Sequence, residues 1–182
     1  MRKSLWPLTL MVTACGIYSM AGSIPPHIHT IAIPLLENRT AEFGVVEDMT
    51  DILQEKFVEE NILQVVPEDR ADSILKGTVE KIEDVPYTFN AQEEVTEYRY
   101  TVVMDITWED KIENKVLLQK KFTGWGAYGT SSDISNDQID NDGDGKIDAE
   151  DPDEFGDPRT FAQQSAIRKI AEDIVNSLLT TW

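Results

Sequence analysis

The chain has one cysteine and two histidines among its 182 residues, and this scarcity limits its chemistry. A single thiol cannot form an internal disulfide. His27 and His29 are spaced as a metal pair, but an isolated His-x-His beside prolines is more often structural or solvated. The sequence contains no glycine-rich phosphate loop, no nucleophile elbow and no His-Glu-x-x-His helix. We therefore expect that the protein is not an enzyme.

Positive charge is also scarce. Lys and Arg total 16 against 34 Asp and Glu, which gives a formal net charge of −18. This balance argues against nucleic acid as a partner, because binding to phosphates requires clustered Lys and Arg. The segment from Asp133 to Asp157 holds eleven acids and one lysine, so it carries more than half of the excess negative charge.

No apolar run reaches the roughly 20 residues that a transmembrane helix needs. The N-terminus nevertheless has the features of a signal peptide, which we assign to residues 1–14. The basic start "MRKS" precedes a short apolar segment, Leu5–Ala14.

Cys15 follows Ala14 directly, and this arrangement resembles the lipobox of bacterial lipoproteins. The resemblance implies that Cys15 is acylated, as with palmitate, and becomes the mature N-terminus. Three acyl chains are ample for stable anchoring. Gly16 is not the aspartate that often retains lipoproteins in the inner membrane, so outer-membrane lipid is the expected anchor. The alternatives are an ordinary signal peptide or a buried free thiol.

Residues 15–27 are small, polar and proline-bearing, which is typical of a tether. Residues 28–182 are expected to form a single α+β domain. Its patterns predict a strand at Ile28–Leu36, an amphipathic helix at Val45–Val58 and a short strand within 61–66. Strands are expected next at Ser73–Glu83, Tyr98–Trp108 and Lys115–Thr123, with the last two joined as a hairpin. The final helix is expected to start at Thr160, as its cap, and to carry an apolar stripe of Ile167, Ile170, Ala171, Ile174, Val175 and Leu178.

In the strand Tyr98–Trp108, apolar side chains share one face while Arg99, Thr101, Asp105 and Thr107 lie opposite. The predicted fold has two helices packed on one face of a mostly antiparallel sheet of four to five strands. Residues 131–158 form an acidic calcium-loop insertion before the last helix.

The insertion contains "DNDGDGKIDAED", in which aspartates alternate and Gly145 takes the position of a sharp turn. Curling such a loop directs its oxygens to one centre, the arrangement that calcium, a hard cation, prefers. The predicted ligands are Asp140, Asp142, Asp144, the carbonyl of Lys146, Asp148 and Asp151. Flanking helices are not predicted, so the segment resembles the free-standing loops of thrombospondin type 3 repeats rather than an EF-hand. The alternative is a solvated acidic linker.

Most of the remaining chain resembles the LptE family, outer-membrane lipoproteins that assist lipopolysaccharide assembly. The resemblance lies in "CGIY", "SIPPHIHTIAIPLLENRT", "ADSILKGTVEKIE", "YRYTVVMDITWED", "GWGAY" and the terminal helix. It implies two helices against a mostly antiparallel sheet, and a role as plug and assembly partner of the LptD β-barrel. Lipopolysaccharide is a further implied ligand. The family brings no catalytic residues, and the acidic insertion departs from its pattern.

Two other classes remain open. "TIAIPLLENRT" followed by an acidic helix also resembles LpoB, a lipoprotein activator of peptidoglycan synthases, and the CsgG secretion channel. A calcium-stabilised structural lipoprotein without a transport role is the third reading. The identity of the partner distinguishes these possibilities.

Overall fold

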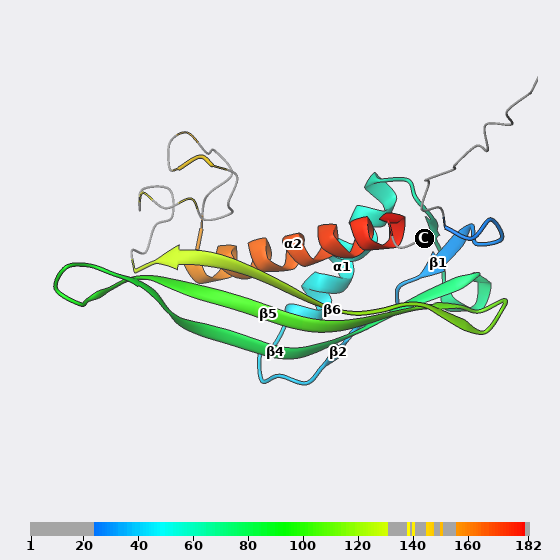
Figure 1. Ribbon diagram of the computed structural model, residues 1–182, viewed down its shortest axis with the longest axis horizontal. Coiled ribbons are helices and arrows are strands. Elements are labelled where there is room, and N and C mark those ends of the chain that lie inside the picture. Colours follow the sequence, from blue (N-terminus) through cyan, green and yellow to red (C-terminus); the bar gives the residue numbers. More distant parts are fainter. Residues whose placement is uncertain are drawn as a thin grey trace, which may run out of the picture.

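Three long antiparallel strands form the body of the molecule (Figure 1). The computed structural model describes residues 24–130, 138, 140, 145–147, 150 and 156–180. The long strands are β4 (Ser73–Phe89), β5 (Val95–Asp110) and β6 (Lys115–Gly129). Two successive hairpins join them, with β5 in the middle. The predicted hairpin between Tyr98–Trp108 and Lys115–Thr123 is therefore confirmed, and all three strands run further than predicted.

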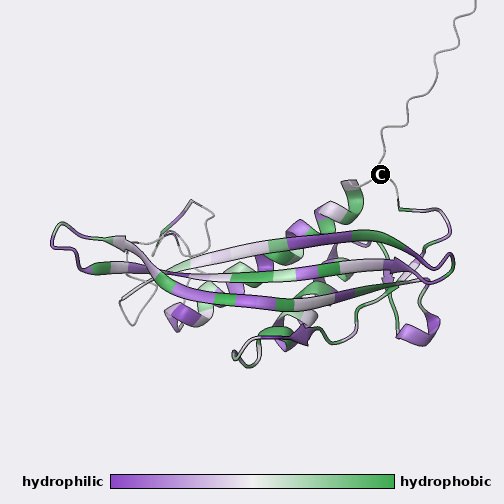
Figure 2. Cartoon of the chain, turned by 60° about the horizontal axis from the view of Figure 1, so that its bottom comes forward, coloured by the Kyte–Doolittle hydropathy of each residue, from purple (hydrophilic) through white to green (hydrophobic). Residues whose placement is uncertain are grey.

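The alternation along β5 divides its side chains between two faces, as predicted. On one face, five side chains have no exposed surface: Tyr100, Val102, Met104, Ile106 and Trp108. The opposite face carries Arg99, Thr101, Asp105 and Thr107. Figure 2 shows the three long strands in front of the helices, with hydrophilic and hydrophobic residues alternating along them. We call the side without helices the open face of the sheet.

Three short parallel strands complete a six-stranded sheet in the order β3-β1-β4-β5-β6, with β2 also paired to β4. They are β1 (Thr30–Ala32), β2 (Glu37–Asn38) and β3 (Gln64–Val65). The α+β class with two helices is confirmed. The prediction of four to five mostly antiparallel strands is inaccurate, because these short pairings are parallel and raise the count to six.

Only Thr30–Ala32 of the predicted strand Ile28–Leu36 forms β1, and Pro34, which has no N–H to give to a ladder, lies two residues beyond its end. Its neighbours bond to a helix instead. The carbonyl of Ile33 accepts from Nε2 of Gln54 at 3.0 Å, and the N–H of Leu36 donates to Oγ1 of Thr50 at 3.3 Å. Helix side chains thus satisfy backbone groups that the broken strand leaves unpaired.

Helix α1 (Val45–Glu59) confirms the amphipathic helix predicted at Val45–Val58. Gly44 precedes it with φ 83°, a left-handed conformation that favours glycine. Its buried stripe packs on the second helix and on the end of the sheet with the short strands, and consists of Val45, Val46, Met49, Thr50, Leu53 and Phe57. A short 3₁₀ turn, η1 (Glu68–Arg70), follows β3.

Helix α2 (Pro158–Thr180) lies along β5 and β6 and buries the predicted apolar stripe of Ile167, Ile170, Ala171, Ile174, Val175 and Leu178. The approach to β6 is very close. A Cβ on Gly124 would stand 2.2 Å from the carbonyl oxygen of Ala166, and one on Gly126 would stand 2.3 Å from that of Ala162. Glycine in "GWGAYG" therefore lets the helix seat directly on the strand.

The helix starts two residues earlier than predicted. Pro158 is its first residue, and Oδ1 of Asp157 accepts the N–H and the hydroxyl of Thr160, both at 2.9 Å. Asp157, rather than Thr160, thus provides the capping acceptor. Among the described residues, no helix combines the length and the apolar character that crossing a membrane requires.

Candidate functional site

The predicted calcium loop is described in part. Gly145 has φ 95°, and its N–H donates to Oδ2 of Asp140 at 2.9 Å. This links the first and sixth positions of the predicted loop, around the turn that glycine permits. Lys146 is exposed. Four of the predicted ligands lie outside the described residues, namely Asp142, Asp144, Asp148 and Asp151. The predicted lipidation site, Cys15, also lies outside them. The calcium site remains a prediction.

Thr130, which precedes the acidic insertion, and Asp157, near its end, border one cleft. It has a volume of about 410 Å³ and lies between the start of α2 and the ends of β5 and β6. Its lining comprises Tyr98, Tyr128, Gly129, Thr130, Asp157, Pro158 and Arg159. The rings of Tyr98 and Tyr128 stack with centroids 5.5 Å apart. The residues at the borders of the insertion therefore lie beside two stacked tyrosine rings.

Hydrogen bonds around Arg159 connect four segments of the chain beside this cleft. Its Nη1 donates to Oε1 of Glu42 at 2.8 Å, and its Nε donates to Oδ2 of Asp84 at 2.7 Å. The hydroxyl of Tyr128 donates to the other oxygen of Asp84 at 2.7 Å. The hydrogen bond to Glu42 and the one to Asp84 raise the pKa of Arg159, while burial and the Asp84 bond raise the pKa of Tyr128. Both groups therefore remain protonated at neutral pH.

The β4–β5 hairpin projects beyond the helices at the end of the molecule opposite the short strands (Figure 1). Its tip is stabilised by Asn90, whose Oδ1 accepts the N–H groups of Gln92 and Glu94. Val85, Tyr87 and Phe89 are 46%, 43% and 58% exposed along this hairpin. A projecting element with several exposed apolar side chains is typical of a surface that meets a partner.

The guanidinium of Arg99 contacts two aromatic rings beside this hairpin, and the two ring centroids lie 6.3 Å apart. The guanidinium carbon of Arg99 lies 3.6 Å from the centroid of the Tyr87 ring and 4.5 Å from that of Trp125. We call these three residues the aromatic–arginine cluster. Tyr, Trp and Arg are the side chains most enriched in the energetic centres of protein interfaces. Sequence reasoning assigned Arg99 only to the polar face and missed the cluster, because its members come from three strands.

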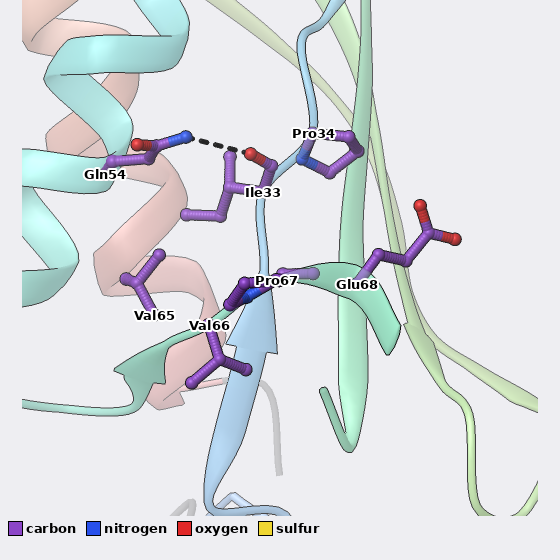
Figure 3. Close-up of a pocket in the computed structure, with 8 residues that line it drawn as sticks. Ile33, Pro34, Gln54, Val65, Val66, Pro67 and Glu68 are labelled. Atoms are coloured by element: carbon purple, nitrogen blue, oxygen red, sulfur yellow. Dashed lines mark hydrogen bonds between the residues drawn. The ribbon is translucent and has the colours of Figure 1, made fainter. Parts of the chain in front are cut away.

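A second cleft, of about 360 Å³, lies where β1 and β3 end beside α1 (Figure 3). Its lining is mostly apolar, from Ala32, Ile33, Pro34, Val65, Val66 and Pro67, with Gln54 and Glu68 as the polar members. The amide of Gln54 is already engaged with the carbonyl of Ile33. The lining contains no nucleophile and no acid–base pair, so this cleft offers no catalytic arrangement.

Comparison with known proteins identifies a family. The model of the family LptE, described as lipopolysaccharide-assembly, matches residues 28–181. No match was found among curated proteins.

Two solved structures of low sequence identity, with TM-scores above 0.5, share the fold. Protein XCC0632 from Xanthomonas campestris has a TM-score of 0.54 at 12% identity, over 87% of this chain and 91% of that one. Protein CT253 from Chlamydia trachomatis has a TM-score of 0.52 at 8% identity, over 83% and 98%. A minor lipoprotein from Acinetobacter baumannii has a TM-score of 0.49 at 16% identity, over 86% and 95%.

The family match covers every helix and strand described above, from β1 to α2. LptE proteins are lipoproteins of the cell envelope and are not enzymes, which agrees with the sequence-based prediction. The chain belongs to the LptE family of lipopolysaccharide-assembly proteins.

Proposed function

We propose that this protein is an outer-membrane lipoprotein, anchored through acylated Cys15, that acts as plug and assembly partner of an LptD-like β-barrel. The observation that carries the proposal is the family match over residues 28–181. In this role the chain helps to assemble the channel that delivers lipopolysaccharide, which is a further candidate ligand. No step of the proposed role requires catalysis by the chain.

The open face and the projecting hairpin support a partner-binding role. No described helix covers this face, and the aromatic–arginine cluster lies on it. Contact with the rings of Tyr87 and Trp125 holds Arg99 in place, so less side-chain entropy remains to be lost on binding. We assign the contact with the barrel to this cluster and to the exposed side chains of Val85 and Phe89.

The test is affinity purification of the tagged full chain from native outer membranes. We expect an LptD-like barrel to co-purify. The triple variant Tyr87→Ala, Arg99→Ala, Trp125→Ala should lower its recovery at least tenfold, since hot-spot truncations each cost about 2 kcal/mol or more. The matched control is Ile112→Ala with Val116→Ala, which removes side chains that are 55% and 50% exposed at the opposite end of the sheet.

Other outcomes would contradict the proposal. Recovery of a peptidoglycan synthase would support the LpoB-like reading, and recovery of a secretion channel would support the CsgG-like one. Depletion that leaves surface lipopolysaccharide unchanged would favour a purely structural lipoprotein. If recovery of the barrel falls equally in the triple variant and in the control, the aromatic–arginine cluster is not the contact with the barrel.

We also propose that the insertion at residues 131–158 binds calcium through Asp140, Asp142, Asp144, the Lys146 carbonyl, Asp148 and Asp151. The bond from the Gly145 N–H to Asp140 supports this proposal. Asp151 stands where a standard loop has a longer Glu, so we expect an affinity typical of extracellular modules, about 10⁻⁴ to 10⁻³ M.

Calorimetric titration of the full chain with calcium tests the second proposal. The double variant Asp140→Asn, Asp144→Asn should abolish the binding heat and the protection of the insertion against protease. Glu93→Gln with Glu94→Gln, at the tip of the β4–β5 hairpin, is the control for the loss of two charges. Unchanged protease resistance after removal of calcium by a chelator would contradict the proposal.

A further inference from the structure

Three side chains that bind metals in other proteins converge at the end of the sheet opposite the projecting hairpin. His27 lies shortly before β1, at the end of the expected tether. Asp110 is the last residue of β5, and Glu113 lies in the turn between β5 and β6. Figure 1 shows the start of β1 and the β5–β6 turn at the same end of the molecule. In the described part of the chain, they are the one group of such donors close enough to share an ion.

The distances fit a common centre. Nε2 of His27 lies 2.6 Å from Oδ2 of Asp110, and one donor atom from each of the three side chains lies within 4.8 Å of the others. The Asp110 side chain is fully buried, whereas the imidazole is 32% exposed. The buried Asp110 is therefore a fixed ligand, whereas the side chains of His27 and Glu113 lie at the surface and can change position.

Asp110 is oriented by the turn that it precedes. Its Oδ1 accepts the N–H groups of Ile112 at 2.8 Å and Glu113 at 2.9 Å. These two bonds leave Oδ2 for His27, and they hold the backbone of Glu113 beside the site. Such supporting hydrogen bonds are what fix the direction of a metal-binding carboxylate.

The local charge also favours a cation. The carboxylates of Asp110, Glu113 and Asp72 surround His27 with negative charge. Oδ2 of Asp72 is already occupied, because it accepts the N–H groups of His29 and Thr30 at 2.9 and 3.0 Å. Asp72 does not belong to the group of three donors and contributes negative charge alone.

We propose that His27, Asp110 and Glu113 bind a divalent transition-metal ion, such as zinc, that fastens the N-terminal segment to the β5–β6 hairpin. One imidazole and two carboxylates suit such an ion, and three protein ligands leave a position for water. The ion takes the place of the hydrogen bond between His27 and Asp110. With donors about 2.1 Å from a tetrahedral metal, this pair opens to roughly 3.4 Å, which the partly exposed imidazole allows.

The site differs from the calcium loop in its chemistry and its consequence. An imidazole nitrogen favours zinc, nickel or cobalt over calcium, which prefers oxygen. The ion would join His27 to Asp110, 83 residues later in the chain. It would thereby set the point at which the tether enters the domain. The proposal is independent of the partner, so failure of barrel capture leaves it intact.

Cobalt titration of the full chain, purified from membranes and treated with chelator, tests the site directly. We expect a visible absorption band for one bound cobalt per chain, lost on addition of zinc and retained in excess calcium. His27→Gln should abolish the band. His29→Gln is the matched control, because this exposed histidine lies two residues away, and it should leave the band unchanged. Absence of the band, or equal loss in both variants, would overturn the proposal.

A second variant distinguishes metal binding from the His27–Asp110 hydrogen bond alone. Glu113→Gln keeps that bond and the N–H groups that Asp110 accepts, so folding should be preserved. We expect zinc affinity at least tenfold weaker than in the wild type, since even outer-shell changes cost 10- to 100-fold. Glu55→Gln, an exposed glutamate on α1, is the control. Wild-type zinc affinity in Glu113→Gln would remove Glu113 from the site and overturn the proposal.

Discussion

The two faces of β5 show how one strand serves two purposes. Toward the helices, its side chains from Tyr100 to Trp108 have no exposed surface. Toward the open face, the same strand carries Arg99 and Asp105, which contact rings or charges from neighbouring strands. Burial makes the first face the source of stability. The second contributes little to folding, so its side chains can be selected for binding.

The largest expected difference in the free energy of unfolding is between two tryptophans, one on each face of the sheet. Trp108→Ala on the buried face should lower the free energy of unfolding by about 3–5 kcal/mol, because a large buried ring leaves a cavity. Trp125→Ala on the open face, where the ring is 40% exposed, should cost about 1 kcal/mol or less. Urea unfolding followed by circular dichroism measures both. Similar losses would mean that the two faces do not differ as described.

The close contact between α2 and β6 provides the next effect. Gly124→Ala should destabilise the fold by about 1–3 kcal/mol, since the new methyl group would meet the backbone of Ala166. The control is Thr123→Ala, one residue away with its side chain exposed. Thermal unfolding of both variants measures the difference. An unchanged melting temperature for Gly124→Ala would show that the helix can move away at no cost.

The cap of α2 gives a smaller, pH-dependent effect. Hydrogen bonds from the backbone and then the side chain of Thr160 lower the pKa of Asp157. Because the pKa is lower in the folded state, this stabilisation is present above about pH 4 and is lost as the pH falls further.

Asp157→Ala should therefore cost about 1 kcal/mol at pH 7 and less below pH 4. Asp157→Asn keeps an acceptor without the charge, so its loss at pH 7 should be smaller, and this loss should also shrink below pH 4 as Asp157 of the wild type is protonated. Urea unfolding from pH 3 to pH 7 provides the test. A constant difference between wild type and Asp157→Ala across this range would contradict the assignment.

The smallest effect is expected for an ion pair at the surface. Nζ of Lys76 lies 2.7 Å from Oε2 of Glu109, with side chains 53% and 34% exposed. Lys76→Gln should change the free energy of unfolding by less than about 1 kcal/mol, because solvent screens exposed pairs. Urea unfolding at low and high salt measures this. A loss above 2 kcal/mol would give the open face a larger role in folding than we assign to it.

Periodicity in the sequence predicted the elements that are long and regular. The helix at Val45–Val58, the alternation in Tyr98–Trp108 and the stripe of the last helix all agree with the structure. Two of the short strands, β1 and β3, lie within predicted strands, whereas β2 was missed because an element of two residues shows no period. The extension of β6 through "GWGAYG" depends on the helix that packs there.

The candidate sites also differ in whether the sequence could predict them. The calcium loop could be predicted because its ligands lie within one short segment. The aromatic–arginine cluster could not, since its stacking depends on the register of three strands. Arg99 could have been noticed as the one cation among the apolar and hydroxyl side chains near the start of β5, but no local pattern indicated its partners.

The sequence by itself determined the α+β class, the buried side of each long element and the family resemblance, because these depend on spacings within single segments. Tertiary structure decided which distant residues meet. Arg159 reaches Glu42 across 117 positions, and His27 reaches Asp110 across 83. The physical reason is that such contacts form only when the packing of the core brings their segments together. A local period carries no information about that packing.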